Sequence, residues 1–144
     1  MNQSGQEGAG YRLIIEAIVA LLILTIILGA VGWVTVFKFY LSDQMFFEGF
    51  SRALESPNGD PIVQKNLVFA GDRMYTTRVF ERYQISGDCI TFDAANLSAL
   101  NLGESRNVIG IEKELLLDVY YRCLGQQQGD CETLCEVSFG KEFE

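Results

Sequence analysis

The residue types that most often carry out chemistry in proteins are unevenly represented in this chain of 144 residues. It has no histidine, and its four cysteines, Cys89, Cys123, Cys131 and Cys135, all lie in the C-terminal part. Histidine is the commonest general base and a common metal ligand, and it activates most serine and cysteine nucleophiles. The composition therefore favours a protein that is not an enzyme and has neither a cofactor nor a metal site.

The four cysteines allow three interpretations. An even number in a small domain favours two disulfides formed in an oxidising compartment. A zinc site usually has two CxxC pairs, whereas the only close pair here is Cys131-x3-Cys135, a spacing that also differs from the CxxC of thiol-disulfide enzymes. Three disulfide pairings are possible. If residues 124–130 form a hairpin loop, Cys123 and Cys131 face each other across its base, which leaves Cys89 for Cys135.

A single carboxylate, Glu16, lies within an otherwise apolar run. From Leu13 to Phe37 the chain has 25 residues with no other charge. A helix of that length extends about 38 Å, enough to cross a hydrocarbon layer of about 30 Å. The run is too long for the core helix of so small a protein, and too long for a cleaved secretory signal. It predicts a helix that spans a membrane.

An ionisable group in such a segment is costly, so Glu16 by default has a function and a partner. One interpretation is a carboxylate that pairs with a positive group when helices leave the lipid and pack together. The alternative is an interfacial glutamate that reaches head-group water, because Glu16 lies only about 5 Å inside the run.

Charge is concentrated after the apolar run. Apart from Glu7, Arg12 and Glu16, all charged residues lie from Lys38 onward, and that part has a net charge of −7. An acidic surface argues against binding nucleic acid, whose partners carry basic patches. Positive charge is nearly balanced across the two flanks, so the cysteines, not the Lys/Arg bias, predict that the C-terminal part lies outside the cytoplasm.

The order of segments predicts an α+β protein. Residues 1–10 are polar and glycine-rich, which indicates a flexible, leader-like segment. A long helix is expected over 11–55, with its membrane part at about 13–37. Its second half is amphipathic, since Phe39, Phe46, Phe50 and Leu54 recur on one face, and the prolines in 56–61 end it. Residues 56–144 then form a small extracytoplasmic β-rich domain stabilised by the disulfides.

Within that domain the pattern predicts short strands at 62–69, 89–92, 107–111 and 115–124, and one after Cys131, in an antiparallel meander against the amphipathic half of the helix. The segment 74–85 fits a strand or a helix, and Asp93 is expected to cap a helical turn. Asn96-Leu97-Ser98 is an N-glycosylation sequon on an expected surface loop. A second sequon begins at Asn2, on the side expected to be cytoplasmic.

The segment "GYRLIIEAIVALLILTIIL", from Gly10 to Leu28, resembles the start of type IV pilins and pseudopilins, and the chain's end is similar to archaeal pilin-like membrane proteins. The resemblance implies that a prepilin-type peptidase removes the leader between Gly10 and Tyr11. A second register, with glutamine first in the mature chain, places the cut between Gly5 and Gln6. It also implies that Glu16 pairs with the freed amine of a neighbouring subunit.

Two functions follow as expectations. The first is a structural subunit of a type IV filament or pseudopilus at the cell surface. Such a subunit assembles through its apolar helix with copies of itself or related subunits. The alternative is an uncleaved single-pass membrane protein, either an accessory subunit of a membrane complex or an anchored extracellular binding module. The partners expected in either case include the membrane and exclude nucleic acid.

Overall fold

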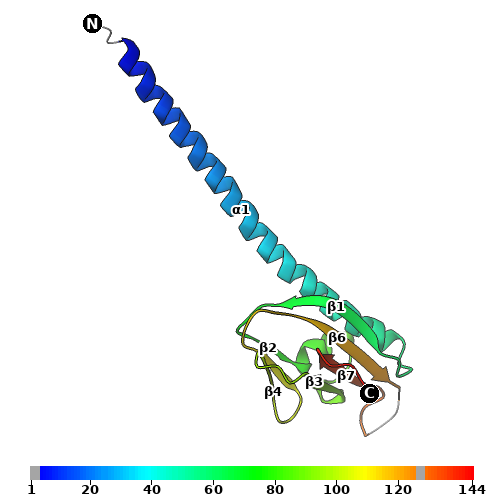
Figure 1. Cartoon of the computed structure of the whole chain (residues 1–144). Helices are drawn as coiled ribbons and strands as arrows, with labels where there is room; N and C mark the ends of the chain where they lie inside the picture. The colour runs from blue at the N-terminus through cyan, green and yellow to red at the C-terminus, as the bar shows by residue number, and fades with distance from the viewer. Residues whose placement is uncertain (1–3, 126–128) are drawn as a thin grey trace. The chain divides into compact units, whose positions relative to one another are not determined.

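A computed structural model describes residues 4–125 and 129–144 of the chain. It divides into two compact units, Met1–Phe37 and Lys38–Glu144. One helix, α1 (Ser4–Glu55), makes up the described part of the first unit and the opening turns of the second (Figure 1). The second unit, called the head below, contains every strand. The α+β class, with a long apolar helix before antiparallel-rich sheets and two disulfides, is confirmed.

The start of α1 differs from the prediction. The helix begins at Ser4 and not near Tyr11, so the described part of the expected flexible leader is helical. Gly8 and Gly10 each lower the stability of a helix by about 1 kcal/mol relative to alanine. Unlike proline, however, glycine keeps the backbone N–H that the helix needs for its hydrogen bonds. The end of α1 at Glu55 agrees with the prediction. Pro57 disfavours the helical conformation of the residue before it and has no backbone N–H to donate to the helix.

The head contains two sheets. The larger has the strand order β1-β6-β7-β3, and the smaller has the order β2-β5-β4. All neighbouring strands are antiparallel except β3 and β7, which run parallel. The strands are β1 (Ile62–Phe69), β2 (Arg73–Thr76), β3 (Ile90–Ala94), β4 (Leu100–Leu102), β5 (Val108–Ile111), β6 (Leu115–Leu124) and β7 (Leu134–Phe139).

The predicted strand positions are mostly confirmed, but the predicted meander is wrong. The chain leaves β3 to build β4 and β5, and returns through β6 before β7 pairs with β3, which makes that pair parallel. The ambiguous segment 74–85 is divided between β2 and a 3-10 helix, Thr77–Tyr83. Asp93 caps no helical turn. It lies in β3, where its carboxylate is 3.3 Å from the Lys141 ammonium.

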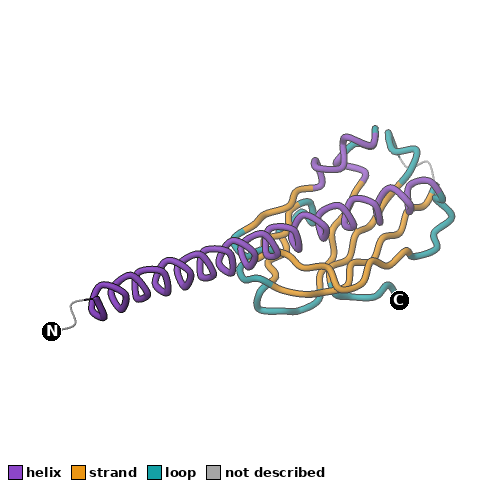
Figure 2. The backbone as a smooth tube through the Cα atoms, turned by 90° about the horizontal axis from the view of Figure 1, so that it is seen from above, coloured by secondary structure: helices purple, strands orange, loops and turns teal. Residues whose placement is uncertain are grey.

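The predicted amphipathic half of α1 is confirmed: it lies along the strands of the head, with one face buried and the other exposed (Figure 2). Phe46 and Phe50 are completely buried and Ala53 nearly so, whereas Phe39 and Leu54 are half-buried. The Phe46 ring has other aromatic rings around it at centroid distances of 5.3–6.0 Å, in the range that aromatic pairs prefer. Those rings belong to Phe47, Phe69, Tyr75, Phe80, Tyr121 and Phe139.

Tyr121 of β6 joins the strands to the helix backbone. Its buried hydroxyl donates a 2.7 Å hydrogen bond to the carbonyl oxygen of Phe46. Burial, and to a lesser degree the neighbouring Tyr83, raises the pKa of Tyr121 well above its ordinary range. The phenol therefore stays protonated at neutral pH and remains a donor, which satisfies a polar group that would be costly to bury alone.

Gly49 permits the close approach of α1 to this tyrosine. A Cβ atom at position 49 would lie 2.5 Å from Cε2 of Tyr121 and 2.7 Å from Cγ of Gln64. Both distances are shorter than van der Waals contact, and the Tyr121 ring is held in place by its hydrogen bond. A residue with any side chain would push the helix away from β6 and β1.

We expect Gly49→Ala to destabilise the head by about 1–2 kcal/mol, because overpacking outweighs the gain in helix propensity. Urea unfolding of the full chain in detergent, with its disulfides intact, measures the change as a lower midpoint. Gly110→Ala is the matched control, since its nearest neighbour, the carbonyl oxygen of Asn101, lies at 3.7 Å. Equal midpoints for the two variants would contradict the close-packing account.

The two predicted disulfides are present, but the predicted pairing is wrong. Cys123 bonds to Cys135, and Cys89 bonds to Cys131. Strand β6 continues to Leu124, which pairs with Leu134, so Cys123 faces Cys135 directly across the β6–β7 ladder at a Cα–Cα distance of 4.1 Å. Cys131 lies before β7, within reach of Cys89, which ends a short 3-10 helix (Gly87–Cys89) directly before β3.

Candidate functional site

The apolar part of α1 has no partner within the structure. None of its most apolar window is buried, and Ile26 and Trp33 each keep 68% of their surface exposed. In the described part of the chain, α1 is the one helix long and apolar enough to cross a membrane. A continuous apolar surface of this length is unfavourable in water, so it requires lipid or other apolar helices around it.

The two threonine hydroxyls inside this segment are satisfied by the helix itself. The Thr25 hydroxyl donates to the Leu22 carbonyl at 2.8 Å, and the Thr35 hydroxyl donates to the Val31 carbonyl at 3.0 Å. Hydrocarbon offers no hydrogen bonds, so a segment buried in it must meet these requirements internally. Both threonines are therefore compatible with a position in lipid.

Amphipathic residues flank the segment at both ends. Tyr11 and Arg12 precede it, and Trp33 and Phe37 stack near its end with ring centroids 5.3 Å apart. Lys38 follows directly in the sequence. Aromatic and basic side chains are enriched where helices leave the hydrocarbon for the head-group region. The candidate membrane span therefore has, at each end, residues suited to the membrane interface.

Glu16 has one basic residue close to it on α1. Arg12 precedes it by one helical turn, and the two side chains line one shallow depression with Gly8, Ala9 and Leu13. No ion pair joins Arg12 and Glu16, although both belong to the described part of the chain. The helix therefore leaves the carboxylate available to a cation from elsewhere, and its role in assembly stays a prediction.

The candidate cleavage positions lie within α1. Gly10 and Tyr11 are helical and exposed, and Gly5 and Gln6 belong to the first turns of the same helix. A peptidase needs an extended peptide across its active site, so cleavage at either position requires a local opening of the helix. Gly8 and Gly10 lower the cost of that opening, since glycine is the weakest helix former apart from proline.

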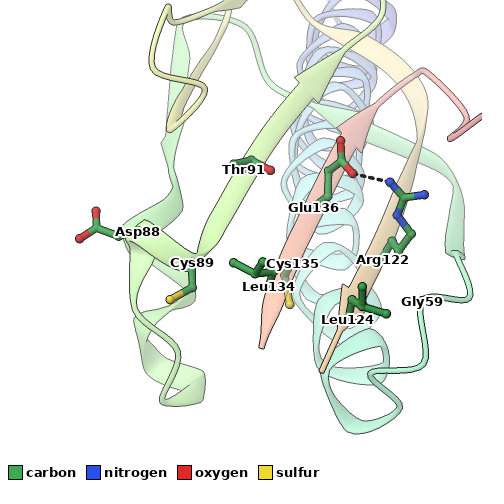
Figure 3. A pocket seen from close by; sticks show the side chains of 9 residues that line it. All are labelled: Gly59, Asp88, Cys89, Thr91, Arg122, Leu124, Leu134, Cys135 and Glu136. Atoms are coloured by element: carbon green, nitrogen blue, oxygen red, sulfur yellow. Dashed lines mark hydrogen bonds and ion pairs between the residues drawn. The ribbon is translucent and has the colours of Figure 1, made fainter. Parts of the chain in front are cut away.

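The head has a groove of about 560 Å³ on the sheet face opposite α1 (Figure 3). Arg122 and Glu136, which face each other across β6 and β7, form an ion pair at 2.7 Å on its wall. Leu124 and Leu134 give it an apolar end. The other lining residues are Gly59, Asp88, Cys89, Thr91 and Cys135.

The groove supplies binding chemistry and no reactive thiol. Cys89 and Cys135, which line it, are both in disulfides, and so are Cys123 and Cys131. Thiolates for a zinc site or a Cys131–Cys135 redox pair are therefore not present in this state. Among the described residues, no group of three acidic, histidine or cysteine side chains is placed to hold a metal. That the protein is not an enzyme stays a prediction.

A polar cluster connecting α1 to β2 has no local signal in the sequence. The Tyr75 hydroxyl donates to one carboxylate oxygen of Asp43 at 3.1 Å, and the Arg73 guanidinium lies 3.3 Å from the other. Burial and the charge of Asp43 raise the pKa of Tyr75. Asp43 precedes Arg73 by 30 positions and Tyr75 by 32, so only the fold brings the carboxylate to these two side chains.

Trp33 is the only tryptophan in the chain, so tryptophan fluorescence measures the depth of this one residue in a membrane. In the full chain reconstituted into lipid vesicles, we expect its fluorescence to be quenched most by lipids brominated near the head group and less by lipids brominated near the chain end. Trp33→Phe provides the blank. Emission typical of water, without quenching at any depth, would contradict a membrane-spanning α1.

Comparison with known proteins gives no identification. No family model, curated protein or solved structure matches the chain. The functional argument therefore depends on the apolar segment of α1 and on the head that continues from it.

Proposed function

We propose that the protein is a pilin-like structural subunit, held in a membrane by α1 and assembled through it into a type IV filament or pseudopilus. One observation supports this most directly. The helix that carries the exposed apolar segment ends as the central core element of a disulfide-bonded head. The apolar segment and the core of the head thus belong to one helix. A filament subunit requires this arrangement, because its helix must pack into the filament core while its head stays attached.

Assembly in this proposal is a transfer of helices from lipid to a bundle of like helices. Lipid and apolar side chains are similar environments for leucine and isoleucine, so apolar contact alone sets no register. Glu16 supplies the missing specificity, because a buried carboxylate is stable only opposite a cation. The cation proposed is the α-amine of a neighbouring subunit, exposed after a prepilin-type peptidase removes the leader.

The proposed location of the head is outside the cytoplasm. Both disulfides join elements that the fold already places side by side, and such bonds persist in oxidising compartments. Residues 38–144 have a net charge of −7, and the acidic, well-solvated surface that this charge predicts suits the same location. The membrane and other copies of this or related subunits are the proposed partners, at the cell surface if the filament forms.

A second candidate is an uncleaved single-pass protein, either an accessory subunit of a membrane complex or an anchored binding module. The observation that favours it is the continuous helix from Ser4 through Gly10 and Tyr11, which leaves no extended segment at the candidate cleavage site. Arg12, one turn from Glu16, would then be the nearest cation on the same chain. The head groove beside Arg122 and Glu136 is the corresponding binding surface.

We expect Glu16→Ala and Glu16→Gln to insert into the membrane normally and to reduce the assembled fraction roughly tenfold, the effect of losing about 1.4 kcal/mol per contact. Carbonate extraction measures insertion, and sedimentation of sheared filaments measures assembly. Glu55→Ala, which removes an exposed acidic residue at the other end of the same helix, is the matched control. Filament yield unchanged by both Glu16 variants would overturn the proposed pairing.

The intact mass of the protein isolated from its own membranes separates the two candidates. For the filament subunit we expect a chain that begins at Tyr11, or at Gln6 in the second register, together with the four-proton deficit of two disulfides. A chain that still begins at residue 1 or 2 would leave Glu16 without a freed amine, and would favour the uncleaved membrane protein.

A further inference from the structure

The connection between β3 and β4, residues 95–99, carries the sequon Asn96-Leu97-Ser98 on a firmly anchored base. The amide of Ala95 donates to the Phe139 carbonyl at 2.8 Å, which ties the start of the connection to the end of β7. Within it, the amide of Leu97 donates to the Ala95 carbonyl at 2.8 Å, and the amide of Leu100 donates to the Leu97 carbonyl at 3.1 Å.

The tip of this connection is open to solvent. Asn96, Leu97 and Ser98 are all exposed, and Leu97 keeps 43% of its surface in water although it is apolar. Neither the Asn96 amide nor the Ser98 hydroxyl makes a side-chain hydrogen bond to any described residue. A side chain that makes no contact needed by the fold, on a turn whose base is held by hydrogen bonds, can be modified without disturbing the fold.

We infer that Asn96 is the acceptor of an N-linked oligosaccharide. The inference rests on the proposed function, because that places the head in the compartment where such transfer occurs. The sequon supplies the two groups required, an amide nitrogen and a hydroxyl two residues later. A glycan at this tip would also shield the exposed Leu97 side chain from water and from proteases.

The reaction needs a donor and a transferase from the cell. The donor is a lipid-linked oligosaccharide, in which a polyprenyl phosphate or diphosphate holds the first sugar. Nδ2 of Asn96 attacks the anomeric carbon, so a C–N bond forms and the C–O bond to the phosphate breaks. The lipid phosphate departs with that electron pair, and Nδ2 gives one proton to a base of the transferase.

The chain contains its own topological control. The other sequon, at Asn2, lies before the apolar segment, and Asn96 lies after it. If α1 spans the membrane, the two asparagines are on opposite sides, and only one can meet the transferase. The remaining asparagines, at positions 58, 66, 101 and 107, are not followed by serine or threonine two residues later.

The test is glycopeptide and intact-mass spectrometry of the full chain, wild type and variants, purified from the cells that produce it. We expect an oligosaccharide mass on the peptide that contains Asn96. It should be lost completely in Asn96→Gln and Ser98→Ala and kept in Ser98→Thr. Asn101→Gln, at an exposed asparagine in β4 outside any sequon, and Asn2→Gln should both leave it unchanged.

Protease added to intact cells distinguishes failure of this inference from failure of the proposed location. An unmodified Asn96 on a head that external protease can cleave would overturn the glycosylation and leave the location standing. An unmodified Asn96 on a protected head would overturn both. Modification at Asn2 would also overturn both, because it places the head in the cytoplasm.

Discussion

The packing of Phe46 and Phe50 into the head is the interaction on which the rest of the structure depends. The two rings come from α1, and apart from the adjacent Phe47 the rings around them come from β1, β2, β6, β7 and the 3-10 helix at 77–83. Complete burial of one phenylalanine contributes about 1.5–3 kcal/mol. A domain of this size is only marginally stable, so the sheets without the end of α1 would lack the centre of their core.

Several polar contacts then fix the helix at one rotation and one depth against the sheets. Tyr121 donates to the Phe46 carbonyl, and the Ser42 hydroxyl accepts from the Val68 amide on the outer edge of β1 at 3.0 Å. The Asp43 carboxylate accepts a hydrogen bond from the Tyr75 hydroxyl, and the Lys38 ammonium lies 3.1 Å from the Glu114 carboxylate. Apolar packing tolerates small rotations, whereas these directional bonds do not. The end of α1 is therefore a built-in part of the head and not a tether to it.

The sequence predicted the features that depend on neighbouring residues. Pro57 ends the helix, the β-branched and apolar residues of 62–69 form a strand, and the spacing of Phe46 and Phe50 marks the buried face. It did not predict features set by residues far apart. The parallel pair β3–β7, the partner of Cys89 and the need for glycine at position 49 all depend on which strand lies beside which. Local propensity was misleading at the glycine-rich start of α1 and at Asp93, which lies in β3 and caps no helical turn.

For the candidate site, the sequence located the apolar segment and Glu16 because length and charge are read directly from the chain. It did not locate the groove of the head, since Arg122 and Glu136 become neighbours only through the β6–β7 register. Sites made by one helix are accessible to sequence reasoning. Sites made by adjacent strands require the pairing to be known first.

Both disulfides cross the same short connection of the chain. Cys89 and Cys123 precede it, and Cys131 and Cys135 follow it. Hydrolysis of any peptide bond between residues 124 and 130 therefore yields two pieces that remain covalently joined twice, with β7 still paired to β6 and β3. A molecule nicked there would keep its fold and its apparent mass, and only a reductant would release the C-terminal piece. Wherever a protease reaches this connection, the two disulfides keep the cut chain together as one covalent molecule.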